Sequence, residues 1–145
     1  MRITADVNIL VSSTFWSGDS DKVLRMIEND EAELVLSAEI LDDFRKVLDY
    51  PEIKDKIRGK GLEMNRTVEK IESISTIVRP ETRLDVVKED PDDNKILECA
   101  LAGKVDYVIS NDKHLLKVKE YSGIRIIKPE ELLIILKEKR TGSKR

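Results

Sequence analysis

The sequence predicts an α/β protein with three layers, in which a central, mainly parallel sheet of about five strands is covered by helices on both faces. Short runs rich in Val, Ile and Leu alternate along the chain with segments whose apolar residues recur at helical spacing. The first of these runs is apolar at nearly every position, which is typical of a central strand in a parallel sheet. The predicted strands cover residues 3–11, 33–36, 76–79, 105–109 and 124–127.

The length of the chain indicates a single domain. It has 145 residues, of which 40% are hydrophobic, and a chain of this size can bury one ordinary core. We expect that domain at residues 1–138. Residues 139–145 are basic and polar, and we expect them to form a disordered tail.

Composition excludes several classes of protein. No apolar run is long enough to span a membrane, and the chain starts with strand-like sequence, so we expect no signal peptide and a cytoplasmic protein. Cys99 is the single cysteine, which excludes an internal disulfide and a cysteine metal cluster, and it lies off the apolar stripe of its helix. The net charge of −3 argues against nucleic-acid binding over the whole surface, although a local basic track stays open.

Two polar residues interrupt the first apolar run. Asp6 and Asn8 share one face of an extended strand, where they would be unusual residues for a central position. The alternative is that they lie at the end of the strand and form local Asx turns. Phe15 and Trp16 follow in a predicted loop and are candidates for the core, for a subunit contact or for base stacking.

Capping residues and apolar stripes predict the helices. Polar residues at 19–21 cap one helix, and Ser37 caps the next. Asp43 borders the apolar stripe of this second helix, so its carboxylate can face either a site or solvent. Further helices are predicted at 52–58, 62–74, 95–102 and 130–138.

An acidic stretch at residues 89–94 leads into one of these helices. Asp90 followed by proline is typical of a helix N-cap with proline at the first helical position. Asp93 falls in the middle of the apolar stripe, because it lies three and four residues before Ile96 and Leu97. A capping carboxylate has no need to face the core, so we infer that Asp93 faces another polar group where the stripe ends.

Four carboxylates are predicted to meet at one edge of the sheet. Asp6 lies near the end of the first strand and Asp112 just past the end of a later one, while the helices that carry Asp43 and Asp93 approach the same edge. Four carboxylates within several Å repel one another, and a bound divalent cation removes that repulsion. His114, the sole histidine, is in an unremarkable helical position, and oxygen ligands alone favour Mg²⁺ or Mn²⁺ over zinc.

The chain carries four short motifs in a characteristic order. They are Asp-x-Asn at 6–8, an acid after Ser-x-x-Ile-Leu at 37–43, Asp-Pro-Asp-Asp-Asn-Lys-Ile-Leu-x-x-Ala at 90–100 and Ser-Asn-Asp-Lys-His-Leu-Leu at 110–116. Together they resemble the PIN domain family, and more narrowly its prokaryotic members that are described as toxin components of toxin–antitoxin systems. The resemblance covers the whole chain up to the basic tail.

The resemblance implies the roles of the site residues. The catalytic acids are Asp6, Asp43, Asp93 and Asp112, the metal ligands are Asp6, Asp93 and Asp112, and the polar supports are Asn8 or Ser110. The family usually has Glu where this chain has Asp43, which is one methylene shorter. The implied activity is that of a Mg²⁺- or Mn²⁺-dependent ribonuclease that hydrolyses RNA phosphodiesters. A homodimer, and a small antitoxin protein as partner, are further implications.

Two alternatives to this activity remain. A catalytically silent PIN-like module would bind RNA or a protein without cutting. A phosphoryl-transfer pocket of the response-regulator type would need an isolated central aspartate, and none is evident. For the nuclease, Arg45, Lys113 and Lys117 are candidates for guiding the RNA backbone, although basic runs are also common on solvated faces.

Overall fold

The computed structural model describes residues 1–15 and 18–142. Its sheet has six strands in the order β3-β2-β1-β4-β6-β5, and all neighbouring pairs are parallel except β5 with β6. The strands are β1 (Arg2–Ala5), β2 (Glu33–Ser37), β3 (Ser75–Val78), β4 (Tyr107–Ile109), β5 (Glu120–Tyr121) and β6 (Ile124–Ile127). The predicted α/β fold is therefore confirmed, and the short strand β5 is the one that the sequence did not indicate.

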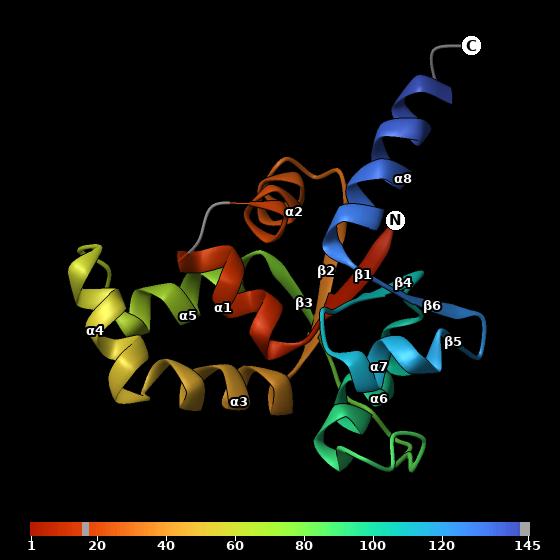
Figure 1. Cartoon of the computed structure of the whole chain (residues 1–145), viewed down its shortest axis with the longest axis horizontal. Helices are drawn as coiled ribbons and strands as arrows, with labels where there is room; N and C mark the ends of the chain where they lie inside the picture. The colour runs from red at the N-terminus through yellow and green to blue at the C-terminus, as the bar shows by residue number, and fades with distance from the viewer. Residues whose placement is uncertain (16–17, 143–145) are drawn as a thin grey trace.

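Helices cover both faces of this sheet (Figure 1). They are α1 (Val7–Phe15), α2 (Asp19–Glu28), α3 (Ala38–Leu48), α4 (Pro51–Gly59), α5 (Met64–Ser73), α6 (Asn94–Gly103), α7 (Lys113–Val118) and α8 (Pro129–Gly142). The chain steps from β1 to β2 to β3 in one direction, and α6 then leads back to β4 on the other side of β1. Because parallel crossovers are right-handed, α6 packs on the face opposite α1, α2 and α3. α8 contacts α2 and completes that layer.

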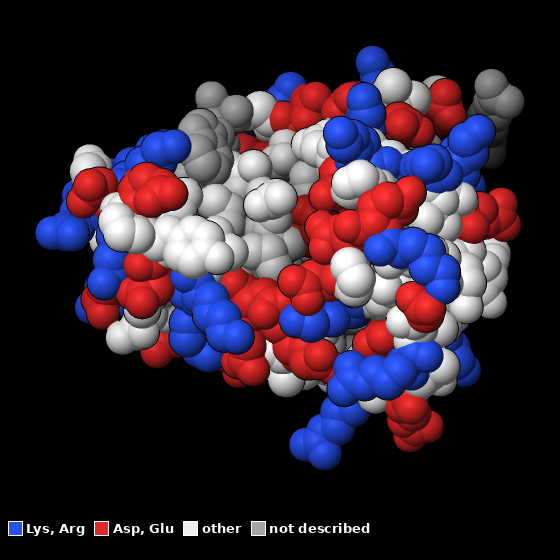
Figure 2. All heavy atoms as spheres, turned by 60° about the horizontal axis from the view of Figure 1, so that its bottom comes forward, with Lys and Arg blue, Asp and Glu red and all other residues white. Residues whose placement is uncertain are grey.

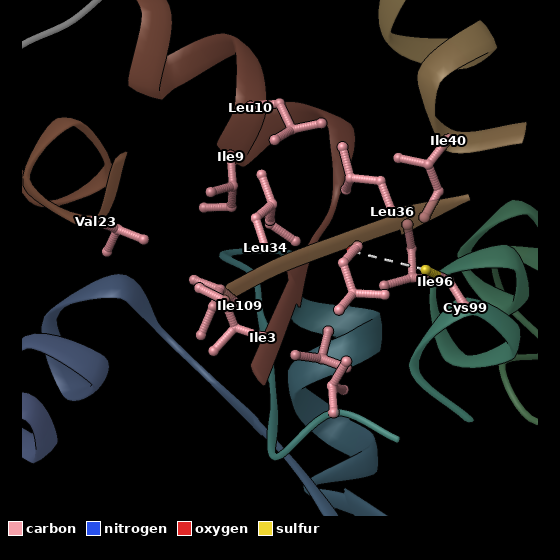
Figure 3. Close-up of a cluster of buried hydrophobic side chains, with 14 of the residues drawn as sticks. Ile3, Ile9, Leu10, Val23, Leu34, Leu36, Ile40, Ile96, Cys99 and Ile109 are labelled. Carbon is pink, nitrogen blue, oxygen red and sulfur yellow. Dashed lines mark hydrogen bonds between the residues drawn. The ribbon is translucent and has the colours of Figure 1, made fainter. Parts of the chain in front are cut away.

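The hydrophobic core lies on both faces of the sheet. In Figure 3, Ile9 of α1, Val23 of α2 and Ile40 of α3 approach the strands from one face. Ile96 and Cys99 of α6 approach from the other. Both faces of the central strands are therefore buried, which explains why their sequences are apolar at successive positions.

The first strand is shorter than predicted. β1 ends at Ala5 and α1 begins at Val7, so the prediction of one strand over residues 3–11 is wrong. Residues 9–11 are buried because α1 lies against both α2 and α3, and periodicity alone does not separate such an enclosed helix from a buried strand. Asp6 stands at the junction, and its Oδ1 accepts a hydrogen bond from the backbone N–H of Ile9 at 2.9 Å. The alternative of a strand end with a local side-chain turn therefore holds for Asp6, whereas Asn8 lies inside α1.

Cys99 lies inside the core, which corrects the expectation that it lies off the apolar stripe of its helix. Its Sγ is fully buried, 3.8 Å from the carbonyl oxygen of Val35 and 3.7 Å from the hydroxyl of Thr4. Burial raises the pKa of this thiol to about 11. α6 packs closely enough on the sheet that residues beyond its predicted stripe are also buried.

The close approach of α6 to the sheet is clearest at its C-terminus. The helix ends at Gly103, one residue beyond the predicted range, and a Cβ at this position would clash with Cγ1 of Val35. The left-handed backbone conformation belongs to the next residue, Lys104, with a φ of 49°. Gly103 is thus required by the packing of the helix on β2.

The C-terminal helix is longer than predicted. α8 continues through Gly142, so it includes the first four residues of the predicted tail, and Arg140 forms an ion pair with Glu31. Residues 143–145 lie outside the described part of the chain, as do Trp16 and the side chain of Phe15, so the predictions for them stay predictions. No described helix combines the length and the apolar character that crossing a membrane requires.

Candidate functional site

The predicted acids lie where the strand order reverses. β1 and β4 are neighbours in the sheet, and the chain leaves them towards opposite edges. In open parallel sheets, ligands bind at such a point, beyond the carboxyl ends of the strands. Ala5 pairs with Ile109, so Asp6 and Ser110 follow the two strands side by side. A cleft of about 520 Å³ opens at this edge.

Most of the predicted site residues line this cleft. Those that do are Asp6, Asn8, Asp43, Asp93 and Asp112. They come from the β1–α1 junction, from α1, from α3, from the 3-10 turn η1 (Pro91–Asp93) and from the start of α7. On the face seen in Figure 2, Asp and Glu side chains gather near the middle, with Lys and Arg side chains around them. The structure thus brings together carboxylates that lie more than 100 residues apart in the sequence.

Asp6 is held rigidly at the base of the site. Its side chain is 6% exposed, and its Oδ2 accepts a short hydrogen bond from the hydroxyl of Ser110. Burial raises the pKa of Asp6, and the charge of Asp112 adds to this, while the hydrogen bonds from Ser110 and from the backbone of Ile9 oppose it. Both carboxylate oxygens therefore have protein donors, which fixes their direction.

Asp112 uses one of its oxygens to cap α7. Oδ1 accepts hydrogen bonds from the backbone N–H groups of His114, at 2.7 Å, and Leu115, at 3.3 Å. The backbone N–H of Asp112 donates to the hydroxyl oxygen of Ser110 at 2.9 Å. Oδ2 takes no part in the cap, so it is the oxygen that can bind a ligand in the cleft.

Asp93 gives the clearest indication that these residues fit a cation. Its Oδ2 is buried and has no hydrogen-bond partner among the described residues. One oxygen each of Asp90, Asp93 and Asp112 lies within 4.8 Å of the other two. Burial, followed by the charges of Asp112, Asp90 and Asp6, raises the pKa of Asp93 to about 7. Three converging carboxylates, one of which has a buried oxygen without a partner, fit Mg²⁺ or Mn²⁺.

Asp90 was not predicted as a site residue. It was interpreted as a capping residue, but its side chain makes no capping hydrogen bond. Residues three apart in a 3-10 turn lie on the same side, and the backbone N–H of Asp93 donates to the carbonyl oxygen of Asp90 at 3.0 Å. The spacing of three within a proline-led acidic turn is the signal in the sequence that could have identified it.

A buried asparagine holds this acidic turn in place. The Oδ1 of Asn94 accepts from the backbone N–H groups of Val86 and Val87, both at 2.9 Å. Its Nδ2 donates to the carbonyl oxygens of Val87 and Pro91, both at 3.1 Å. One turn further along α6, Glu98 accepts from the backbone N–H of Leu84 at 2.9 Å. The segment that precedes the acidic turn is therefore tied to α6 by side chains.

Asp43 has a different partner from the other acids. Its Oδ2 lies 3.1 Å from Nζ of Lys95, which also lies 3.6 Å from Oδ1 of Asp92. The helical wheel placed Asp43 at the edge of its stripe, and it does line the cleft. The acidic motif at 90–100 contains Lys95 but does not predict its partner, because the contact joins two helices that are far apart in the chain.

The residues predicted to guide RNA lie outside the cleft lining. Arg45, Lys113 and Lys117 are exposed. Arg45 lies 3.6 Å from Asp42, and Lys117 lies 3.4 Å from Glu89. Of the described Lys and Arg residues, those that line the cleft are Lys46 and Lys95. The role of the outer cations stays a prediction.

Comparison with known proteins agrees with this architecture. The family model described as PIN domain matches residues 2–114. The crystal structure of PAE2754 from Pyrobaculum aerophilum is similar at a TM-score of 0.58 and 15% identity, over 95% of this chain and 90% of that one. This likeness concerns the fold alone, and no curated protein matched the chain. PIN domains are usually metal-dependent nucleases, and the acidic cluster here could bind a metal ion. The chain belongs to the PIN domain family.

Proposed function

We propose that the protein is a Mg²⁺- or Mn²⁺-dependent endoribonuclease that hydrolyses RNA phosphodiesters at this cleft. The observation that carries the proposal is the convergence of the Asp90, Asp93 and Asp112 carboxylates, together with the buried, unpaired Oδ2 of Asp93. A buried carboxylate oxygen without a partner is costly unless a proton or a cation satisfies it. The family's usual activity supports the same conclusion.

The proposed metal ligands are Asp93 and Asp112, as the sequence indicated, together with Asp90. Asp6 lies at the base of the same cleft and is the further proposed ligand. When bound, the metal ion would lower the pKa of a coordinated water and stabilise the charge that develops on the phosphodiester. No side chain is proposed as a covalent nucleophile.

The chain's own residues would orient the reacting groups. Ser110 holds the carboxylate of Asp6 through a hydrogen bond. Asp112 uses Oδ1 to cap α7, and this cap fixes the direction of its other oxygen, Oδ2. Asn8 and Asp43 also line the cleft and would contact the attacking water or the ribose. Lys46 and Lys95 are placed to meet phosphate oxygens, with Arg45, Lys113 and Lys117 as proposed outer contacts.

The resemblance of the sequence motifs supports a more specific proposal, that the protein is the toxin of a toxin–antitoxin pair in the cytoplasm. It would act as a homodimer and be neutralised by a small antitoxin protein. Expression in a bacterial host tests this role: growth should stop, and co-expression of the neighbouring small gene should restore it. Growth that continues with active nuclease present would contradict the toxin role alone.

Cleavage of a panel of structured and single-stranded RNAs tests the nuclease. The purified protein is compared with Mg²⁺, with Mn²⁺ and with EDTA, beside the variants Asp93→Asn and Asp42→Asn. Asp42 is an exposed carboxylate of α3 that does not line the cleft, so its variant is the matched control. Metal-dependent cleavage that only Asp93→Asn abolishes supports the proposal. RNA binding without cleavage would favour the silent binding module.

A further inference from the structure

Carboxylates that line the cleft differ in their charge partners. Asp90, Asp93 and Asp112 converge within 4.8 Å of one another, and no Lys or Arg in the described part of the chain forms an ion pair with them. Asp43, in contrast, has the ammonium group of Lys95 at 3.1 Å. Asp90, Asp93 and Asp112 thus have no Lys or Arg side chain paired with them among the described residues, whereas Asp43 is paired with Lys95.

The position of Lys95 is set by the packing of two helices. It lies in the first turn of α6, between the buried side chains of Asn94 and Ile96, and α6 contacts α3, which carries Asp43. The side chains of Lys95 and Asp43 are each 31% exposed, so solvent screens this pair less than it screens a surface pair. The ammonium also lies 3.6 Å from Asp92. The ion pair thus joins the two walls of the cleft.

We propose that the ammonium of Lys95 is a built-in cation that takes the place of a second metal ion, so that the site binds one divalent ion. This inference rests on the proposed function, because it assumes that Asp90, Asp93 and Asp112 hold a metal. In two-metal nucleases, carboxylates hold a second cation about 4 Å from the first. Of the carboxylates that line the cleft outside the close cluster, Asp43 and Asp92 lie beside the ammonium of Lys95. Asp6, in contrast, accepts hydrogen bonds from Ser110 and from the backbone of Ile9.

The same contact gives Lys95 a role towards the substrate. An ammonium group has three N–H donors, and Asp43 takes one of them at hydrogen-bond distance. The remaining donors can meet a phosphate oxygen that enters the cleft, where the ammonium supplies positive charge without a metal. Lys95 therefore orients Asp43 and adds positive charge within the cleft.

The stoichiometry of Mn²⁺ binding tests the inference without reference to activity. Metal-free full-length protein is titrated with Mn²⁺, and the bound ions per chain are counted by calorimetry and by electron paramagnetic resonance. We expect one ion for the wild type, for Lys95→Arg, which keeps the charge, and for the control Lys46→Gln, whose residue lines the same cleft. We expect two ions for Lys95→Gln, and one again when Asp43→Asn is added to it. Circular dichroism establishes that each variant is folded.

The outcomes separate this inference from the proposed function. Two ions bound to the wild type, or one ion bound to folded Lys95→Gln, would overturn the role of Lys95 while leaving a metal-dependent nuclease intact. A wild-type chain that binds no Mn²⁺ would overturn the proposed function, and the inference with it. The spin–spin broadening expected from two neighbouring Mn²⁺ ions should be present only in Lys95→Gln.

Discussion

The hydroxyl of Ser110 donates a hydrogen bond to the carboxylate of Asp6, and it links two strand ends that lie 104 residues apart in the sequence. The same hydroxyl accepts a hydrogen bond from the backbone N–H of Asp112 at 2.9 Å. One fully buried serine therefore sets the relative positions of two acids of the cleft. A metal site needs neighbouring groups that hold its ligands in position, and Ser110 does this for Asp6 and Asp112.

Replacing this serine should weaken both the fold and the metal site. Ser110→Ala leaves a buried oxygen of Asp6 without its donor, so we expect a loss of about 1–3 kcal/mol in the free energy of unfolding. We also expect weaker Mn²⁺ binding, about tenfold or more. Urea denaturation and calorimetry measure the two effects. Ser110→Thr keeps the hydroxyl and should recover most of the affinity, while Ser73→Ala, at an exposed position, should change neither quantity.

Loss of the buried asparagine should loosen the acidic turn. Asn94→Ala leaves the backbone N–H groups of Val86 and Val87 without their acceptor, so we expect a loss of about 2–4 kcal/mol of unfolding free energy. Hydrogen exchange at these two amides should become faster than at the amides of β1. Protection at Val86 and Val87 that is unchanged in the variant would show that Asn94 does not hold this segment.

The contact between α6 and the sheet predicts that replacing two glycines by alanine has different effects on the free energy of unfolding. Gly103→Ala places a Cβ against Val35, and we expect it to cost about 1–3 kcal/mol of unfolding free energy. Gly59→Ala meets open space at the end of α4 and should be neutral or slightly stabilising. Thermal unfolding of the two variants checks this, and equal effects would contradict the packing of α6.

The raised pKa of Asp93, about 7, predicts how the metal-free protein responds to pH. Because the folded-state pKa lies above the unfolded value of 3.8, this residue's stabilising contribution is complete below about pH 4 and is lost as pH rises through about 7. In EDTA, Asp93→Asn should therefore match the wild type near pH 4 and exceed it at pH 8. We expect the difference to be about 1–2 kcal/mol, since Asp93 is partly exposed. Added Mg²⁺ should stabilise the wild type at pH 8 and have little effect on the variant.

Much of the fold follows from the sequence because apolar runs and helix caps are local signals. Ser37 caps α3 as predicted, with its hydroxyl oxygen accepting from the backbone N–H of Ile40 at 3.2 Å. The failures lie where local signals are ambiguous. Residues 9–11 form part of an enclosed helix, so their uniform apolar character was interpreted as a strand. The basic character of residues 139–142 concealed the last turn of α8.

The sequence predicts those site residues whose position follows from the order of the strands and helices. Asp6 and Asp112 follow strands whose carboxyl ends meet, and this could be predicted before any contact was known. Lys95 and Asn94 could not, because their partners depend on side-chain directions across the interior. Asp90 is hidden for another reason: its place before a proline is typical of a helix cap, and a cap residue needs no second role to explain its carboxylate.

The most direct test of the account is calorimetric titration of Mn²⁺ into metal-free wild-type protein and into the double variant Asp93→Asn/Asp112→Asn at pH 8. Two of the three converging carboxylates lose their charge in the variant, while Asp6 and Asp43 are unchanged. We predict binding to the wild type and a loss of affinity of at least about a hundredfold in the variant, which follows from removing two anionic ligands. Unchanged affinity in the variant would contradict the assignment of the metal centre.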